Sequence, residues 1–213
     1  SEMILSARYA ALSLPLVLGI ATLCLVLSFV TNDFHVKYVA GHSNLAMEPW
    51  LTWVAFYAGN EGSLLFIANI YSVLALFALW RAPVESQFSL PYTTAVMMLV
   101  VLFFTSVMAT LANPFEVLPF APEDGEGINP LLTHPGMIIH PPMLMTGLVG
   151  VAIPFSFAMG HLLSGEMEDQ WIEAARTWGL IIWAILSIGL LLGAWWAYTI
   201  LGWGGYWAWD PVE

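Results

Sequence analysis

PYTTAVMMLVVLFFTSVMATLA, residues 91–112, is the stretch that decides the fold of this chain, because it contains no charged side chain. An α-helix rises about 1.5 Å per residue, so about 20 apolar residues cross the hydrocarbon core of a bilayer, which is roughly 30 Å thick. A core helix of a soluble protein is rarely so long and so uniformly apolar. The stretch therefore predicts a membrane-spanning helix.

Four other uncharged apolar runs of comparable length lie on either side of this one. They cover residues 9–30, 62–80, 141–163 and 177–200. The chain of 213 residues is 60% hydrophobic and only 9% charged, which is the composition of a membrane protein. We predict an all-α fold: a polytopic integral membrane bundle of about five transmembrane helices, forming one membrane domain over residues 1–213. Its partner is then the lipid bilayer, and we expect no nucleic acid to bind.

The first apolar run and the cysteine count exclude several other interpretations of the chain. More than twenty uncharged residues follow Arg8 with no small-residue cleavage site, so the first run is expected to stay as a helix rather than to be removed as a signal peptide. Cys24 is the single cysteine, which excludes both a thiol oxidoreductase and a disulfide scaffold.

Lysine and arginine predict the orientation, since cytoplasmic loops of membrane proteins carry an excess of both. With five spans, a cytoplasmic N-terminus places Arg8, Arg81 and Arg176 inside and only Lys37 outside. Three segments are then expected on the outer face, which is periplasmic in a bacterium. They are residues 31–61, 113–140 and 201–213.

The first outer segment contains aromatic side chains at helical spacing, namely Trp50, Trp53, Phe56 and Tyr57. Residues 50–60 are too few to cross a membrane. They predict a short amphipathic helix that lies at the membrane interface.

Four of the five histidines lie in the outer segments, and His140 is placed most favourably for chemistry. Pro141 and Pro142 suit the first turn of a helix, so His140 is expected at the mouth of the fourth span. The positive end of that helix disfavours imidazolium, which leaves a neutral ring able to bind a metal. A helix cap or a hydrogen bond to the next loop is the other interpretation of His140. His134 is expected to be an interfacial hydrogen-bonding residue. The remaining histidines, expected to be solvated or interfacial, are His35, His42 and His161.

The last eleven residues, WGGYWAWDPVE at 203–213, gather aromatic side chains between glycines. An aromatic belt at the membrane surface explains one or two such residues, but not this density. Glycines let a backbone approach a flat ligand, and each aromatic contact adds roughly 0.5–1.5 kcal/mol beyond the area that it buries. We call residues 203–213 the aromatic segment and predict that it holds a flat apolar ligand. Histidines on the same face make an iron macrocycle the favoured interpretation.

The aromatic segment resembles WGxWWxWDxxE, the WWD motif of the haem-handling membrane proteins of cytochrome c maturation, and specifically of the CcmF branch. Other stretches resemble that family in the same order along the chain. They are TNDFHVKYVAGHSN at 31–44, AGNEGSLLF at 58–66, ANPFEVLP at 112–119 and INPLLTHPGMIIHPPML at 128–144. The resemblance covers nearly all of residues 30–213.

The resemblance implies a haem lyase component of the bacterial inner (cytoplasmic) membrane. Such a protein takes haem b from the periplasmic chaperone CcmE and presents it to the CxxCH cysteines of apocytochrome c, helped by a CcmH-type thiol protein. A haem transport or docking module without lyase activity, like the CcmC relatives, is the alternative. The family also implies that the WWD loop cradles haem and that His140 is an axial ligand of its iron; no catalytic acid or base is evident. The cofactor-binding residues implied are His140, Trp203, Gly204, Gly205, Tyr206, Trp207, Trp209 and Asp210.

The chain departs from the family pattern at several places. Tyr206 stands where the family has tryptophan, and Asn60 stands where it has histidine, so no histidine function is carried over to that position. The chain begins at what resembles the second span of the family and ends inside the WWD motif. We therefore expect the N-terminal part of a larger protein, with the second axial ligand and a buried haem site beyond Glu213.

Overall fold

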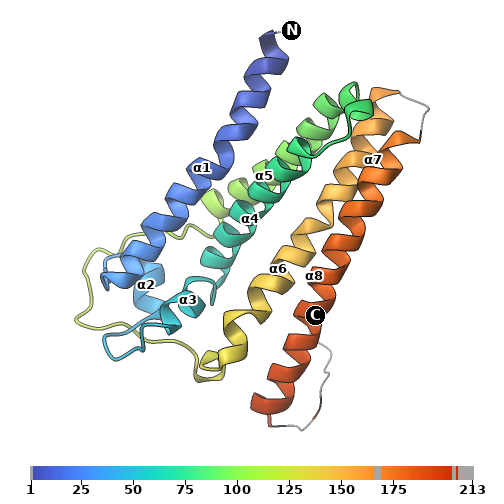
Figure 1. Ribbon diagram of the computed structural model, residues 1–213. Coiled ribbons are helices and arrows are strands. Elements are labelled where there is room, and N and C mark those ends of the chain that lie inside the picture. The colour runs from blue at the N-terminus through green and yellow to red at the C-terminus, as the bar shows by residue number, and fades with distance from the viewer. Residues whose placement is uncertain (1, 166–168, 203–204, 206–213) are drawn as a thin grey trace.

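The computed structural model describes residues 2–165, 169–202 and 205, and most of these residues are helical (Figure 1). The long helices run side by side as a bundle. They are α1 (Glu2–Val30), α4 (Asn60–Trp80), α5 (Leu90–Thr110), α6 (His140–Gly150), α7 (Ala152–Ser164) and α8 (Gln170–Ile200). The short helices are α2 (Lys37–His42), α3 (Leu51–Phe56), η1 (Val84–Gln87), η2 (Pro130–Leu132) and η3 (Pro135–Ile138).

Five helical segments of the described chain are long and apolar enough to cross a membrane. Between 17 and 39% of each apolar window is buried inside the protein, so most of these apolar side chains face outward, where lipid covers them. The predicted all-α membrane bundle with five spans is confirmed, and the chain is a multi-pass membrane protein. The segments are Tyr9–Val30, Asn60–Trp80, Leu90–Thr110, Pro135–Ser164 and Trp171–Ile200.

The fourth span is not the single helix that the run 141–163 predicts. It consists of α6 and α7, which meet at Val151. Pro154 has no backbone N–H and its ring clashes with the carbonyl four residues earlier, at Gly150. The hydrogen bond from Phe155 N to the Val151 carbonyl is correspondingly long, at 3.5 Å. The proline therefore ends α6 and redirects the chain into α7.

Glycines bring α6 and α8 into close contact. A Cβ atom added to Gly147 would lie 2.6 Å from the Cα atom of Leu186, and one added to Gly189 would lie 2.8 Å from the backbone nitrogen of Leu144. Small residues at such positions let two membrane helices approach until backbone meets backbone. On α8 the seam follows the sequence GLLLG, residues 189–193, a spacing that is typical of helix interfaces in membranes.

The segments 31–59 and 111–139 are tied to each other at the end of the bundle that carries α2 and α3 (Figure 1). Val36 and Val117 form an isolated antiparallel bridge, and Lys37 Nζ lies 3.0 Å from the Glu116 carboxylate. Farther along, Glu126 N donates to the Ala40 carbonyl at 2.7 Å. The loop at 111–139 therefore lies against the segment at 31–59, as one layer over the helix ends.

The predicted amphipathic helix exists but is shorter and more deeply packed than the sequence indicates. It is the six-residue α3, in which Val54, Ala55 and Phe56 have no exposed surface. Trp53 stays 41% exposed. The helix therefore belongs to the protein core on one side and presents an indole on the other.

Candidate functional site

His140 is the first residue of α6 and lies buried between α6 and α8, with 5% of its surface exposed. Its Nδ1 atom is 2.8 Å from the Gly189 carbonyl oxygen. A carbonyl only accepts hydrogen bonds, so Nδ1 carries a proton, and the tautomer with this hydrogen bond has its lone pair on Nε2. This is the arrangement by which proteins orient histidines that ligate metals, because the hydrogen bond at one nitrogen selects the ring state at the other.

The ring of His140 is held on two further sides by α8. It stacks on Trp196, with ring centroids 6.3 Å apart and an interplanar angle of 18°. A Cβ atom added to Gly193 would lie 2.4 Å from Cε1 of His140, which shows that the imidazole rests on the glycine backbone. The local sequence around His140 points to none of these contacts, because the partners lie about fifty residues later. The available signal was the GLLLG spacing at residues 189–193, which indicates a helix interface on α8.

The turn before His140 is anchored by two aromatic residues of the segment 31–59. Tyr57 donates from its hydroxyl to the Met137 carbonyl at 2.6 Å, and Trp53 Nε1 donates to the Ile138 carbonyl at 3.1 Å. Both carbonyls belong to η3, which leads directly into His140. Burial raises the pKa of Tyr57 above its ordinary value, so the hydroxyl remains a donor. The aromatic residues predicted for an interfacial helix thus position the histidine.

Replacement of Tyr57 by phenylalanine tests this anchor. We expect the variant to lose about 1–2 kcal/mol of unfolding free energy, because the Met137 carbonyl is left without its donor. Thermal unfolding in detergent measures the loss, with the exposed Tyr92→Phe as the matched control. Burial raises the pKa of Tyr57 in the folded protein, so its ionisation at high pH favours the unfolded state. The difference in unfolding free energy between wild type and Tyr57→Phe should therefore be largest below the ordinary pKa of 10.0 and shrink as the pH rises above it. Equal midpoints for Tyr57→Phe and wild type would contradict the role of this hydroxyl.

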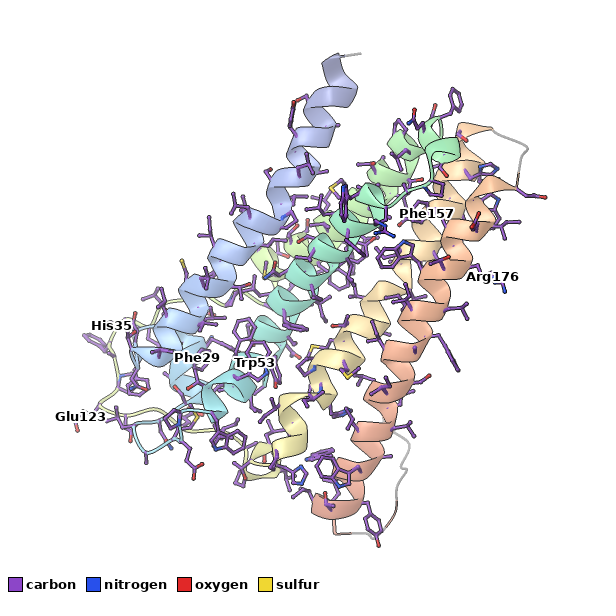
Figure 2. The ribbon with its side chains drawn as sticks, viewed as in Figure 1. Phe29, His35, Trp53, Glu123, Phe157 and Arg176 are labelled. Carbon is purple, nitrogen blue, oxygen red and sulfur yellow. The ribbon has the colours of Figure 1, made fainter. Side chains whose placement is uncertain are left out.

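The other histidines have different surroundings. His134 caps η3 by accepting the Gly136 N–H on Nδ1 at 3.0 Å, and its ring meets Trp195 edge-on, in line with a hydrogen-bonding role. His35 is exposed at the tip of the outer loop (Figure 2). His161 is only 7% exposed and lies against Trp171, so its ring is not solvated, whereas its place at the membrane interface stays a prediction. Packing of the Trp171 ring of α8 against the imidazole is the physical reason.

The remaining predicted site residues are in the aromatic segment. Gly205 is described and is partly buried after the end of α8. The others lie outside the described residues, so their part in the site stays a prediction. They are Trp203, Gly204, Tyr206, Trp207, Trp209 and Asp210.

A metal ion at His140 would have to bring most of its own ligands. In the part of the chain that the structure describes, no three histidine, cysteine or carboxylate side chains lie close enough together to hold an ion. A porphyrin supplies four nitrogens and needs only axial donors from the protein. The donor set present, one oriented imidazole beside an indole, therefore fits an iron macrocycle better than a bare metal ion.

These features define a polytopic helical membrane protein with a buried, oriented imidazole at one end of its bundle. The cytochrome c assembly protein family matches residues 57–213. The chain belongs to this family, and to the CcmF type within it. Relatives of this type are named as cytochrome c-type biogenesis proteins.

Individual relatives agree with this placement. The chain is 41% identical to the cytochrome c-type biogenesis protein CcmF of Pseudomonas aeruginosa, over 97% of the chain and 32% of that protein. It is 39% identical to CcmF of Escherichia coli, over 100% of the chain and 33% of the relative. A solved structure named Cytochrome c Heme Lyase CcmF matches with a TM-score of 0.84 and 34% identity, over 100% of this chain and 33% of that one. The chain thus spans about a third of the length of these relatives.

Proposed function

We propose that this chain builds the haem-presenting face of a CcmF-type haem lyase, with His140 as an axial ligand of the haem iron. The observation that carries the proposal is the hydrogen bond from His140 Nδ1 to the Gly189 carbonyl, since it leaves the lone pair on Nε2. The name of the solved relative, a cytochrome c haem lyase, supports the same activity.

The cargo is haem b, and the aromatic segment is the surface on which it lies. Trp203, Tyr206, Trp207 and Trp209 supply flat apolar faces, and Gly204 and Gly205 let the backbone come close. The role proposed for Asp210 is to accept hydrogen bonds from neighbouring backbone amides. The indole of Trp196, stacked on His140, lies on the helix that leads directly into this segment.

In the proposed reaction the protein orients its substrates. Each CxxCH thiol of the apocytochrome adds across one vinyl group of haem, so that the sulfur bonds to one vinyl carbon, the thiol proton ends on the other, and no group leaves. His140 holds the iron and the aromatic segment holds the ring plane while this occurs. The proposed donor of haem is the chaperone CcmE, and a CcmH-type thiol protein is the proposed helper.

The orientation supports these partners. With Arg8, Arg81 and Arg176 on the cytoplasmic side, His140 and the aromatic segment face the periplasm of a bacterial inner membrane. The proposed chaperone and apocytochrome then meet the site on the periplasmic side.

Haem absorbance tests the proposed surface. We expect the protein purified from membranes to show a Soret band, and the double substitution Trp207→Ala, Trp209→Ala to lower it at least roughly fivefold, because two stacking faces are lost. Trp183→Ala is the matched control, since Trp183 is 66% exposed on the lipid-facing side of α8. A Soret band of equal height in all three proteins would exclude the aromatic segment as the haem-binding surface.

Copurification separates the lyase from the alternative of a haem docking module. A lyase is expected to copurify with a CcmH-type protein and with apocytochrome c, whereas a docking module is expected to copurify with the chaperone alone. The second result would leave the haem site in place but remove the proposed attachment reaction.

A further inference from the structure

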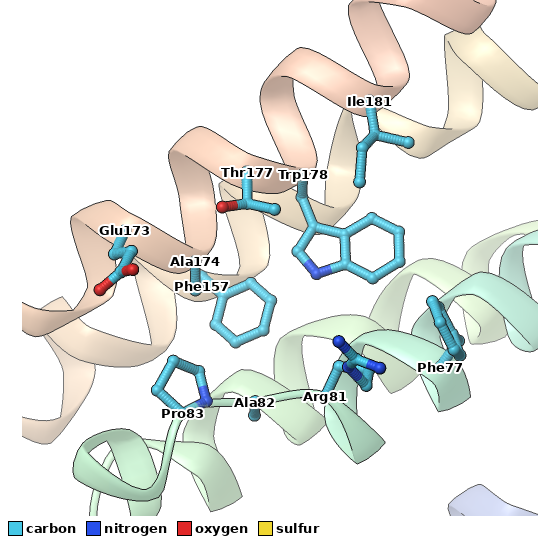
Figure 3. A pocket seen from close by; sticks show the side chains of 10 residues that line it. All are labelled: Phe77, Arg81, Ala82, Pro83, Phe157, Glu173, Ala174, Thr177, Trp178 and Ile181. Carbon is cyan, nitrogen blue, oxygen red and sulfur yellow. The ribbon is translucent and has the colours of Figure 1, made fainter.

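The structure has a pocket at the end of the bundle far from His140. It lies between the end of α4, the turn that follows it, and the start of α8, and it measures about 300 Å³ (Figure 3). That volume is at the lower end of the range for small-molecule sites. Neither the proposed haem site nor the proposed reaction uses it.

Two opposite charges line this pocket from different elements. Arg81 follows the last turn of α4, and Glu173 lies in the first turns of α8 (Figure 3). No ion pair joins these two described residues, and both side chains are partly open to solvent. Each therefore retains charge-assisted hydrogen-bonding capacity, the guanidinium as a donor and the carboxylate as an acceptor.

The floor between the charges is apolar. Phe77 and Trp178 meet edge-to-face with centroids 5.8 Å apart, and Phe157 is 2% exposed beneath them. In Figure 3 the rings of Phe157 and Trp178 lie between the two charged groups, and Ile181 continues the apolar wall along α8. The wall therefore runs from the charged rim toward the middle of the span.

The depth of the pocket identifies the kind of ligand. Arg81 comes directly after the membrane span Asn60–Trp80, and Glu173 is near the start of the span Trp171–Ile200, so both lie at the level of lipid headgroups. A ligand that fits has one anionic and one hydrogen-bond-donating cationic group at one end, and an apolar remainder.

We propose that this pocket binds a phospholipid with a primary ammonium headgroup, of the phosphatidylethanolamine type. Its phosphate accepts from the Arg81 guanidinium, its ammonium donates to the Glu173 carboxylate, and an acyl chain lies along Trp178 and Ile181. Phosphatidylglycerol has no cation for Glu173, and the quaternary ammonium of phosphatidylcholine has no N–H to donate.

Photo-crosslinking tests the proposal on the protein purified from membranes and reconstituted in nanodiscs. Diazirine-labelled phosphatidylethanolamine should label peptides from residues 171–181 and 77–83, as mapped by mass spectrometry. We expect Arg81→Ala and Glu173→Gln each to reduce this labelling by roughly three- to tenfold, because each removes one charge-assisted contact.

Arg176→Ala is the matched control, because Arg176 is exposed on the same helix and points away from the bundle (Figure 2). Its labelling should equal that of wild type. Labelled phosphatidylglycerol and phosphatidylcholine should give weaker labelling of wild type, and Glu173→Gln should bring the three lipids to the same level.

Three results would overturn the proposal. The first is absence of labelling at these peptides in folded wild type, which would mean that another part of the protein fills the pocket. The second is labelling that does not depend on Arg81 or Glu173, which would mean ordinary boundary lipid. The third is equal labelling by all three lipids in wild type, which would exclude selection of the ammonium group.

Discussion

Replacement of His140 by alanine is expected to lower haem occupancy of the purified protein by more than roughly tenfold, because the iron loses an axial ligand. Thioether formation with a CxxCH peptide, measured with haem-loaded chaperone as donor, should fall in parallel. His134→Ala is the matched control, since His134 caps η3 and is not the proposed ligand. It should retain most of the haem.

A loss of folding would imitate this result, because the Gly189 carbonyl also loses its partner in His140→Ala. Added imidazole separates the two causes. If the ring acts as a ligand, free imidazole in the cavity should restore the Soret band of His140→Ala, whereas a misfolded bundle gains nothing from it. Equal haem occupancy and thioether yield in His140→Ala and wild type would refute the assignment.

The second large effect is expected from Gly193, whose backbone lies against the imidazole of His140. A Cβ atom at this position would lie 2.4 Å from Cε1 and 3.0 Å from Nε2 of His140, so Gly193→Val must displace the imidazole or separate α6 from α8. Overpacking of this kind costs roughly 1–3 kcal/mol. We expect the variant to unfold at a lower temperature and to lose most of its haem.

Gly179→Val is the control for the change in helix propensity. Gly179 lies on the same helix α8, and a Cβ atom there meets nothing within 4 Å. Its melting temperature and haem spectrum should match wild type. If Gly193→Val and Gly179→Val had the same melting temperature and haem spectrum, the close contact between Gly193 and His140 would not matter for stability or haem binding.

Hydropathy was sufficient to predict the spans, because the lipid core accepts only helices whose backbone groups are paired internally and whose side chains are mostly apolar. The break at Val151 was predictable in principle from Pro154, whose missing N–H acts only on its own turn. The burial of α3 was not predictable, since Trp50, Trp53 and Phe56 show the same spacing whether that face meets lipid or protein. Likewise, His161 offered no local sign that Trp171 would cover it.

The sequence by itself determined the membrane bundle, the proline turn that starts α6 at His140 and the family to which the chain belongs, because hydropathy, proline and motif residues act locally. Only the tertiary structure decided which ring nitrogen of His140 keeps its lone pair. That choice depends on a carbonyl 49 residues away and on a glycine seam that brings two helices within backbone contact. It also depends on the anchor from Trp53 and Tyr57 to η3. Contacts between distant segments carry no local signal, so they emerge only when the helices pack.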